Sequence, residues 1–469
     1  MTRSSNIVAA DVRRRTPSAT QQLRIVAADV RRRTPGATNA PAAASPRRLR
    51  GNAAFTLQPR HCTNAVVIIL TLLVLLSPLH AEMEWFDKVE ETLTVQSSNG
   101  WFRAQLSGLA DLETYYVEQP PPGLIFDDDS LFFNPRLSLF LDTHFGPHVY
   151  SLIQARLDRG FDPMSKPDGD VRLDEYLIRY TPFEADQLNV QAGKFATVIG
   201  NWVPRHDSWK NPFITAPLPY DNVLVITDRT VPPSTAAFLA RRTKPDQKQA
   251  WLPLIWGPSY ATGVSVFGLI NRFEYAFELK NAALSSRPEF WEPNRQGWSA
   301  PTVSGRIGYR PNAAWNVGAN FSRGSYLSRE TESALPAGKD RIDFNQTTLG
   351  PDISFAWRHW EFFGELYASR FEAPAAGDAD TVAYYLETKY EITPRLFTAM
   401  RWNQQLFGKV SNGPGSEEPW DRDIWRIDTA VGYRLNRHMQ AKLQYSYNRQ
   451  RGTPEQGDQL IATQLTLKF

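Results

Sequence analysis

Apolar and polar residues alternate along the last part of the chain. One face of residues 459–469 carries Ile461, Thr463, Leu465, Leu467 and Phe469. The positions between them are mostly polar, and residues 437–449 and 422–434 repeat the alternation. Because successive side chains of a β-strand point to opposite faces, each segment predicts a strand with one apolar and one polar face.

The same alternation continues toward the N-terminus and predicts sixteen strands. Their expected spans are 101–117, 131–145, 148–160, 171–181, 187–199, 259–270, 272–282, 302–310, 314–323, 347–357, 359–371, 380–391, 395–407, 422–434, 437–449 and 459–469. Short turns, such as Gly146-Pro147, Asn271 and Arg358, alternate with longer connections. This alternation is typical of outer-membrane barrels, which have short periplasmic turns and long external loops.

The two faces of these strands differ as the two sides of a membrane barrel do. The apolar face carries aromatic rings near the strand ends, and such rings prefer the headgroup level of a membrane. The other face is too polar for a packed core. We expect it to line a lumen at Arg136, Arg156, Arg306, Glu361, Glu365, Arg401, Arg426 and Asp428. Because a closed barrel satisfies every backbone hydrogen bond in lipid, residues 101–469 predict an all-β, transmembrane, antiparallel up-and-down barrel.

Three segments precede the predicted barrel. Residues 1–60 are rich in Arg, Ala and Pro, contain the sequence IVAADVRRRTP twice, and are expected to be a disordered leader. Residues 61–81 contain twelve largely apolar residues, fewer than the roughly 20 that cross a bilayer as a helix, and are expected to be a signal peptide cleaved after Ala81. Residues 82–100 are expected to be a short periplasmic segment.

Charge and residue types argue against several other functions. The formal charge of +3 arises from twelve Arg in residues 1–81; the remaining 40 basic and 47 acidic residues carry a net charge of −7, so no nucleic-acid partner is expected. Cys62 is the only cysteine, which excludes a disulfide framework. His206-Asp207-Ser208 has the residue types of a hydrolase triad, but a triad normally joins separate segments. We expect no catalytic residue, no metal and no cofactor.

The C-terminal strand ending in Phe469 resembles the C-terminal signature of bacterial outer-membrane proteins. With the signal peptide and the sixteen strands, it resembles the porin superfamily. Residues 173–183 and 188–202 are also similar, over a short length, to strand pairs of the phosphate-selective porin-like group, but we do not carry phosphate selectivity over. The resemblance implies a cell outer-membrane location, contact with outer-membrane lipid and recognition of Phe469 by the barrel-assembly machinery. It also implies a homotrimer by analogy, although no residue in the chain points to one.

The connection 200–258 is the longest in the predicted barrel, and its position makes it the third external loop. A loop of this length is usually functional or disordered, and this one holds seven aromatic rings that need burial. In classical sixteen-stranded porins the third loop narrows the channel, and the resemblance implies the same here. The candidate constriction residues are Lys194, Arg205, Asp207, Lys210, Asp228, Arg229, Arg241 and Arg242.

One hypothesis is that Arg205, Lys210, Arg229 and Lys194 face acidic groups across the narrow part of a pore, where charge sets ion preference. The alternative is that each pairs with a lumen carboxylate or faces solvent. For the chain as a whole, we expect a channel for passive diffusion of small polar solutes or ions. Two alternatives stay open: a barrel enzyme of the phospholipase kind, and a structural or adhesin barrel with a sealed lumen.

Overall fold

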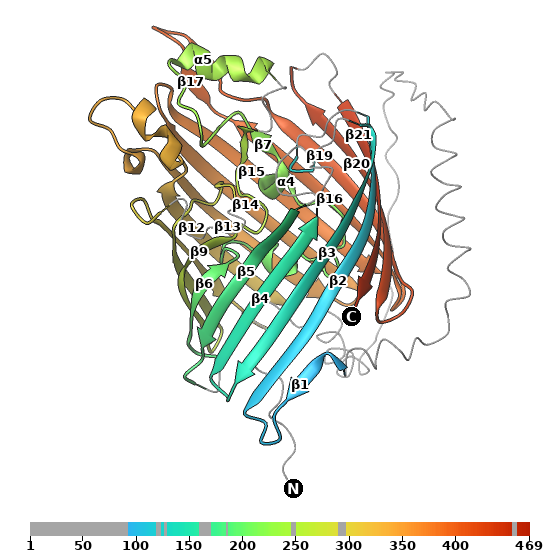
Figure 1. The fold of residues 1–469 in the computed structure, drawn as a ribbon. Helices are drawn as coiled ribbons and strands as arrows, with labels where there is room; N and C mark the ends of the chain where they lie inside the picture. The colour runs from blue at the N-terminus through green and yellow to red at the C-terminus, as the bar shows by residue number, and fades with distance from the viewer. Residues whose placement is uncertain are drawn as a thin grey trace, which may run out of the picture.

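The computed structural model describes residues 92–118, 123–125, 129–158, 170–183, 186–244, 250–288, 297–452 and 457–469. Sixteen antiparallel strands form a closed barrel, in which β2 pairs with both β3 and β21 (Figure 1). The strands are β2 (Phe102–Val117), β3 (Leu131–Phe145), β4 (Val149–Asp158), β5 (Asp170–Tyr180), β6 (Asn189–Phe195), β9 (Ala261–Ile270), β10 (Phe273–Lys280), β11 (Thr302–Tyr309), β12 (Trp315–Ser325), β13 (Asn345–Trp357), β14 (Trp360–Ala373), β15 (Gly377–Glu391), β16 (Leu396–Phe407), β19 (Ile424–Arg434), β20 (Met439–Gln450) and β21 (Gly457–Lys468). The predicted fold class is therefore confirmed.

The predicted leader 1–60 and signal peptide 61–81 lie outside the described residues. Of the predicted periplasmic segment 82–100, the described part contains a short strand, β1 (Thr94–Gln96), which pairs with the beginning of β2. β1 and the C-terminal residue Phe469 both lie at the end of the barrel where the short turns are. We call the opposite end, which carries the long connections, the external end.

The tight turns between paired strands have the backbone that two-residue hairpins need. Asn271 and Arg358 adopt positive φ angles of 56° and 55°. Each begins a two-residue connection, because Ile270 pairs with Phe273 and Trp357 pairs with Trp360. Such turns match the right-handed twist of the flanking strands.

Two expectations about element lengths are wrong. The connection between β14 and β15 has only three residues, 374–376, because the alternating pattern continues through Glu372 and Asp378 into a hairpin. β6 ends at Phe195 rather than near residue 199. The backbone N–H groups of Ala196 and Val198 donate to the carboxylates of Glu175 and Glu278 instead of to a neighbouring strand.

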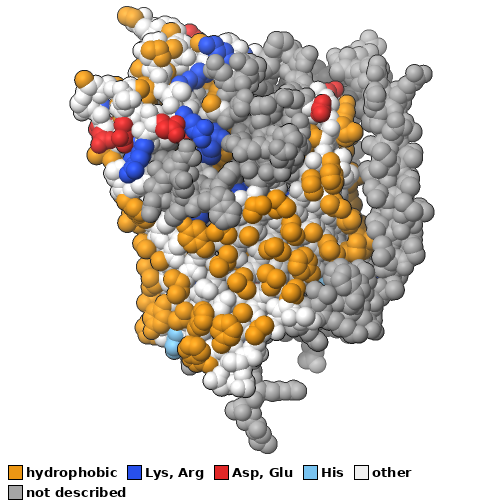
Figure 2. Space-filling view, in the orientation of Figure 1, with side chains coloured by type: hydrophobic (Ala, Val, Ile, Leu, Met, Phe, Trp, Pro, Cys, Tyr) orange, Lys and Arg blue, Asp and Glu red, His pale blue; other side chains and the backbone are white. Residues whose placement is uncertain are grey.

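The outward face of the wall is apolar and exposed. It includes Leu141, Ile153, Ile178, Val264, Phe277, Ile307, Ile353, Leu386, Met400 and Val431. Figure 2 shows hydrophobic side chains spread over the visible wall, while charged side chains gather toward the external end. A soluble protein does not expose a continuous apolar wall of this extent, whereas a barrel in lipid requires one. The barrel is therefore a membrane barrel.

No helix in the described part of the chain combines the length and the apolar character needed to cross a membrane.

Candidate channel lumen

Residues 196–260 connect β6 to β9, and we call their described part, 196–244 and 250–260, the inner segment. Most of it lies inside the barrel. It contains a 3-10 turn η1 (Val203–Arg205), helix α4 (Leu218–Asp221), helix α5 (Thr235–Ala240), a second 3-10 turn η2 (Arg241–Thr243) and a small hairpin of β7 (Val223–Leu224) with β8 (Leu252–Pro253). α4 is seen within the barrel outline in Figure 1, whereas α5 lies at the external end. The inward folding expected for the third external loop is thus confirmed.

Wall carboxylates and an amide hold the first part of the inner segment by its backbone. Glu278 of β10 accepts hydrogen bonds from Thr197 Oγ1 at 2.6 Å and Val198 N at 3.1 Å. Asn320 of β12 accepts one from Gly200 N at 2.9 Å. Glu365 of β14 accepts four, from the backbone N–H groups of Asn201 and Trp202 and from the hydroxyls of Tyr220 and Tyr367. The segment therefore crosses the lumen from β10 to β14 on polar supports.

Gly200 is required at this crossing. Its φ angle of 78° is unfavourable for other residues. A Cβ at this position would lie 2.4 Å from the hydroxyl oxygen of Tyr220 and 2.8 Å from Glu365 Oε1. The close approach of the backbone to the wall depends on the missing side chain.

Basic and amide groups hold the next part of the segment along β16, β19 and β20. Arg401 donates to the carbonyl oxygens of Thr215 and Ala216 at 3.0 and 3.2 Å, and Arg426 also donates to Ala216 O. Gln444 Oε1 accepts from the N–H groups of Ile214 and Thr215 at 2.6 and 3.1 Å. Because an unpaired buried backbone group is costly, these contacts fix the path of the inner segment.

An apolar core fills the space between the inner segment and the wall toward the external end. It includes Trp202, Leu224, Ile226, Phe238, Leu254, Trp256, Tyr367, Phe371 and Trp420, all of them buried. The aromatic residues that made residues 200–258 notable in the sequence are thus sheltered by the barrel.

A second connection covers the inner segment at the external end. The indole of Trp420, between β18 (Glu417–Pro419) and β19, lies 4.9 Å from the ring of Phe407 and 6.2 Å from that of Phe238. Next to it, Asp421 accepts a hydrogen bond from Val225 N at 2.9 Å. Burial raises the pKa of the Asp421 carboxyl to about 6, although its backbone hydrogen bonds act in the opposite direction.

The predicted lumen-wall residues all lie on the inner face, and each is paired. Arg136 binds Asp111 and Glu113, and Arg156 binds Asp158. Arg306 binds Asp352 and Glu274, and Glu361 binds Lys389. Arg401, Arg426 and Asp428 form one chain of ion pairs, and Glu365 is the backbone support described above.

Among the predicted constriction residues, three lie near the crossing of the lumen. Arg205 is buried, binds Glu387 and places its guanidinium 3.8 Å from the Phe363 ring centroid. Asp207 and Lys210 form an ion pair of 3.3 Å and are partly exposed. Lys194 lies in β6 and donates to Leu173 O at 2.6 Å. Arg205 therefore pairs with a wall carboxylate, as the alternative hypothesis states, and does not face acidic groups across an open pore.

The other four constriction candidates lie toward the external end. Arg242 binds Glu418 and Pro419 O, and Arg241 donates to the carbonyl oxygens of Val225 and Thr230. Asp228 is buried, and its carbonyl oxygen accepts from Ser328 N. Arg229 is exposed. The structure thus does not bring the eight candidates together in one ring.

Several supports of the inner segment are absent from the predicted sites, namely Glu278, Asn320, Glu387, Asn403, Lys442 and Gln444. The strand alternation already places them on the inner face. However, no sequence signal distinguishes a wall side chain that faces water from one that binds the inner segment, 80 to 234 residues away in the chain.

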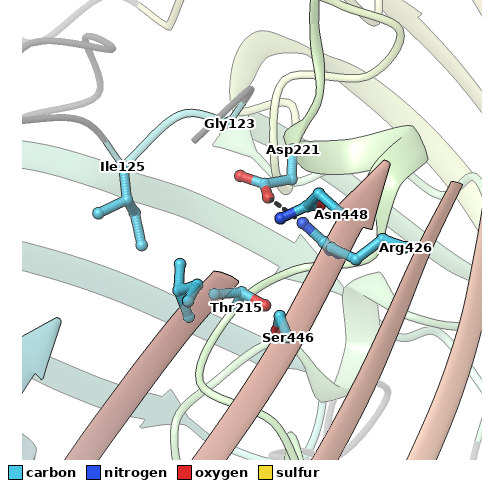
Figure 3. Close-up of a pocket in the computed structure, with 8 residues that line it drawn as sticks. Gly123, Ile125, Thr215, Asp221, Arg426, Ser446 and Asn448 are labelled. Carbon is cyan, nitrogen blue, oxygen red and sulfur yellow. Dashed lines mark hydrogen bonds and ion pairs between the residues drawn. The ribbon is translucent and has the colours of Figure 1, made fainter. Parts of the chain in front are cut away.

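Two cavities lie against the inner segment, and both are small. One of about 10 Å³ lies between the inner segment and the wall, where Figure 3 shows Asp221 paired with Arg426 beside Thr215, Ser446 and Asn448. The other, also of about 10 Å³, lies near Phe238 and Tyr326. Each has room for about one water molecule. Within the described residues, no group of three His, Cys, Asp or Glu side chains could hold a metal ion.

The chain is thus a sixteen-stranded membrane barrel whose polar lumen is occupied by the inner segment. No family model and no curated protein sequence matches the chain. Among solved structures, it is similar to OmpT of Vibrio cholerae, with a TM-score of 0.50 at 8% identity over 80% of this chain and 99% of that one. It is also similar to the anion-selective porin from Comamonas acidovorans, with a TM-score of 0.50 at 9% identity over 78% of this chain and 100% of that one. A third similar structure is the outer-membrane channel DcaP of Acinetobacter baumannii, with a TM-score of 0.50 at 10% identity over 80% of this chain and 99% of that one. At these identities the likeness shows the fold alone, and the predicted resemblance to porins is confirmed at that level.

Proposed function

We propose that the barrel is a channel for passive diffusion of small polar solutes or ions, and that the inner segment restricts it. The observation that carries the proposal is the inner face, which remains ionic on both sides of the inner segment. Near the short turns, partly exposed Glu274, Arg310, Glu361 and Arg434 surround the lumen. Because these side chains are partly exposed, the lumen at this depth holds water, as a channel requires.

The neighbours in fold support the same proposal. One is described as an anion-selective porin and another as an outer-membrane channel. Their names do not decide the charge preference here, since the described wall carries ions of both signs.

A sealed structural barrel is the second candidate. The apolar core around Trp256 and the water-sized cavities favour it, because a passive channel needs a continuous aqueous path. We do not propose catalysis.

Liposome swelling separates the two candidates. Purified barrel is reconstituted into liposomes, and swelling rates are measured in isotonic sugars and amino acids of graded size. A channel gives swelling that falls with solute size. If neither the intact barrel nor a variant that loosens the inner segment, such as Gly200→Val, produces swelling, the channel proposal is wrong.

A further inference from the structure

A lysine of the wall binds three carbonyl oxygens of the inner segment. Lys442 of β20 directs its Nζ toward Ser208 O at 2.5 Å, Asn211 O at 2.8 Å and Phe213 O at 3.4 Å. An ammonium group has three N–H donors and no acceptor. The three carbonyl oxygens therefore use every donor that Lys442 has. We call residues 208–213 the tip of the inner segment.

Two other buried wall lysines have carboxylate partners. Lys389 pairs with Glu361 and Glu391, and Lys280 pairs with Glu278 while it also donates to the carbonyl oxygens of Phe195 and Ser259. Lys442, in contrast, forms no ion pair with a described carboxylate, although it is buried. Because a buried charge needs compensation, the carbonyl dipoles of the tip supply it. The arrangement is a cation site made of backbone oxygens, as carbonyl groups form in ion channels.

The two aromatic rings of the tip also face cations of the wall. Lys468 Nζ lies 5.6 Å from the ring centroid of Trp209, and the Arg401 guanidinium lies 4.2 Å from that of Phe213. The faces of aromatic rings carry partial negative charge and attract cations. The tip thus turns carbonyl oxygens and ring faces toward cations of β16, β20 and β21.

We propose that the tip is a binding site for a primary ammonium group, that Lys442 fills this site from within the chain, and that the tip keeps its fold only while an ammonium is bound. When the lysine side chain is removed, the site takes a small primary ammonium ion from solution. The inference does not depend on whether the barrel conducts, because the fold of the tip is measured without a channel recording.

The test uses Lys442→Ala together with n-propylammonium chloride, which replaces the three methylene groups and the ammonium that the substitution removes. A cysteine at Lys210, beside the binding oxygens, reports on the fold of the tip through its rate of maleimide labelling, with Cys62→Ser in every variant. We expect Lys442→Ala to accelerate labelling at least about tenfold, since charge-assisted hydrogen bonds are lost. n-Propylammonium should restore slow labelling.

Two controls make the result specific. Lys442→Met keeps the length of the side chain and leaves no room for the added amine, so its labelling should be fast and unaffected by n-propylammonium. Tetramethylammonium carries the charge without N–H donors and should not rescue Lys442→Ala. Slow labelling of Lys442→Ala without amine, or an equal response of the Ala and Met variants, would overturn the proposal.

The proposal stays testable if Lys442→Ala does not fold in these conditions. The folded yield is then compared by the shift in gel mobility between heated and unheated samples. A yield that recovers with n-propylammonium but not with tetramethylammonium supports the site. Equal yields with both ions would count against it.

Discussion

Single inward-facing side chains set the position of the inner segment. Glu365 is the clearest example, since its two oxygens accept from two backbone N–H groups and two tyrosine hydroxyls. The sequence predicts that this residue faces a lumen, and it does. Because its four donors are buried, its role is to satisfy protein groups rather than to attract solutes.

Replacing Glu365 should release the inner segment. Glu365→Ala leaves the N–H groups of Asn201 and Trp202 and one tyrosine hydroxyl without an acceptor, because Tyr220 and Tyr367 can still bind each other at 3.0 Å. This should destabilise the segment by about 3 kcal/mol or more. Glu365→Gln keeps one acceptor oxygen and should cost less. Limited proteolysis measures how well residues 196–260 are protected from cleavage. Protection should decrease in the order wild type, Glu365→Gln, Glu365→Ala, and conductance in planar bilayers is the second measurement. Equal protection of all three would show that Glu365 is not a support.

The structure separates two basic residues that the sequence treats alike. Arg205 is buried against Glu387, whereas the side chain of Lys210 is 35% exposed. Lys210→Glu should therefore shift ion preference toward cations and disturb the fold less than Arg205→Glu, because the Lys210–Asp207 pair is partly exposed and screened by water. Arg205→Glu places two carboxylates together and should instead lower folded yield. Reversal potentials in a salt gradient measure the first effect, and unchanged potentials for Lys210→Glu would refute the constriction hypothesis at this residue.

The connection between β18 and β19, which carries Trp420 and Asp421, packs over the inner segment. We expect the stability of this packing to depend on pH. Since burial raises the pKa of Asp421 to about 6, above its usual value of 3.8, the packed state binds the proton more tightly. The packing is then most stable below about pH 4 and loses stability as pH rises through 6. The loss is at most about 3 kcal/mol.

Hydrogen exchange of residues 408–423 should accordingly be faster at pH 7 than at pH 5, after correction for intrinsic exchange. Asp421→Asn has no carboxyl to ionise, so its corrected exchange should be the same at both values. A pH dependence that persists in Asp421→Asn would assign it to another group.

The first and last strands of the barrel meet around one ring. Gly108 and Phe469 exchange backbone hydrogen bonds at 2.9 and 3.1 Å, and a Cβ on Gly108 would lie 2.4 Å from the phenyl ring. Gly108→Val should therefore reduce the folded fraction in gel-mobility assays. Combining it with Phe469→Ala should restore part of the loss that Gly108→Val causes. If the double variant folds no better than Gly108→Val alone, the ring contact is not the cause.

Sequence reasoning recovers elements better than contacts in this chain. The period of two predicts β20 and β21 within two residues, because lipid on one side and polar groups on the other impose a local pattern. It does not predict that β6 stops at Phe195, since that depends on Glu175 and Glu278, which are distant in the chain. The partner of Arg205 is likewise set by tertiary packing.

For the molecule as a whole, the wall is uneven in height. β6, β10 and β11 have seven, eight and eight residues, whereas β14 and β15 have fourteen and fifteen. Eight tilted residues rise about 20 Å, less than the apolar band of about 25 Å around such barrels. Lipid beside the short strands must thin, unless another protein surface lies there.

We expect that surface to be a second copy of the chain. A cysteine at Val303, exposed on the outer face of β11, should form disulfide-linked copies in membranes when oxidised. Leu386 of β15 is equally exposed to lipid and serves as the matched control. Linkage at both positions to the same extent would indicate random collision and refute a specific contact.

A barrel of constant height has the same hydrophobic thickness around its whole circumference. This barrel has short strands on one side and long strands on the other, so it deforms the surrounding lipid acyl chains by different amounts around its circumference. Lipids of different chain length and neighbouring proteins should therefore distribute unevenly around the barrel, even without specific contacts.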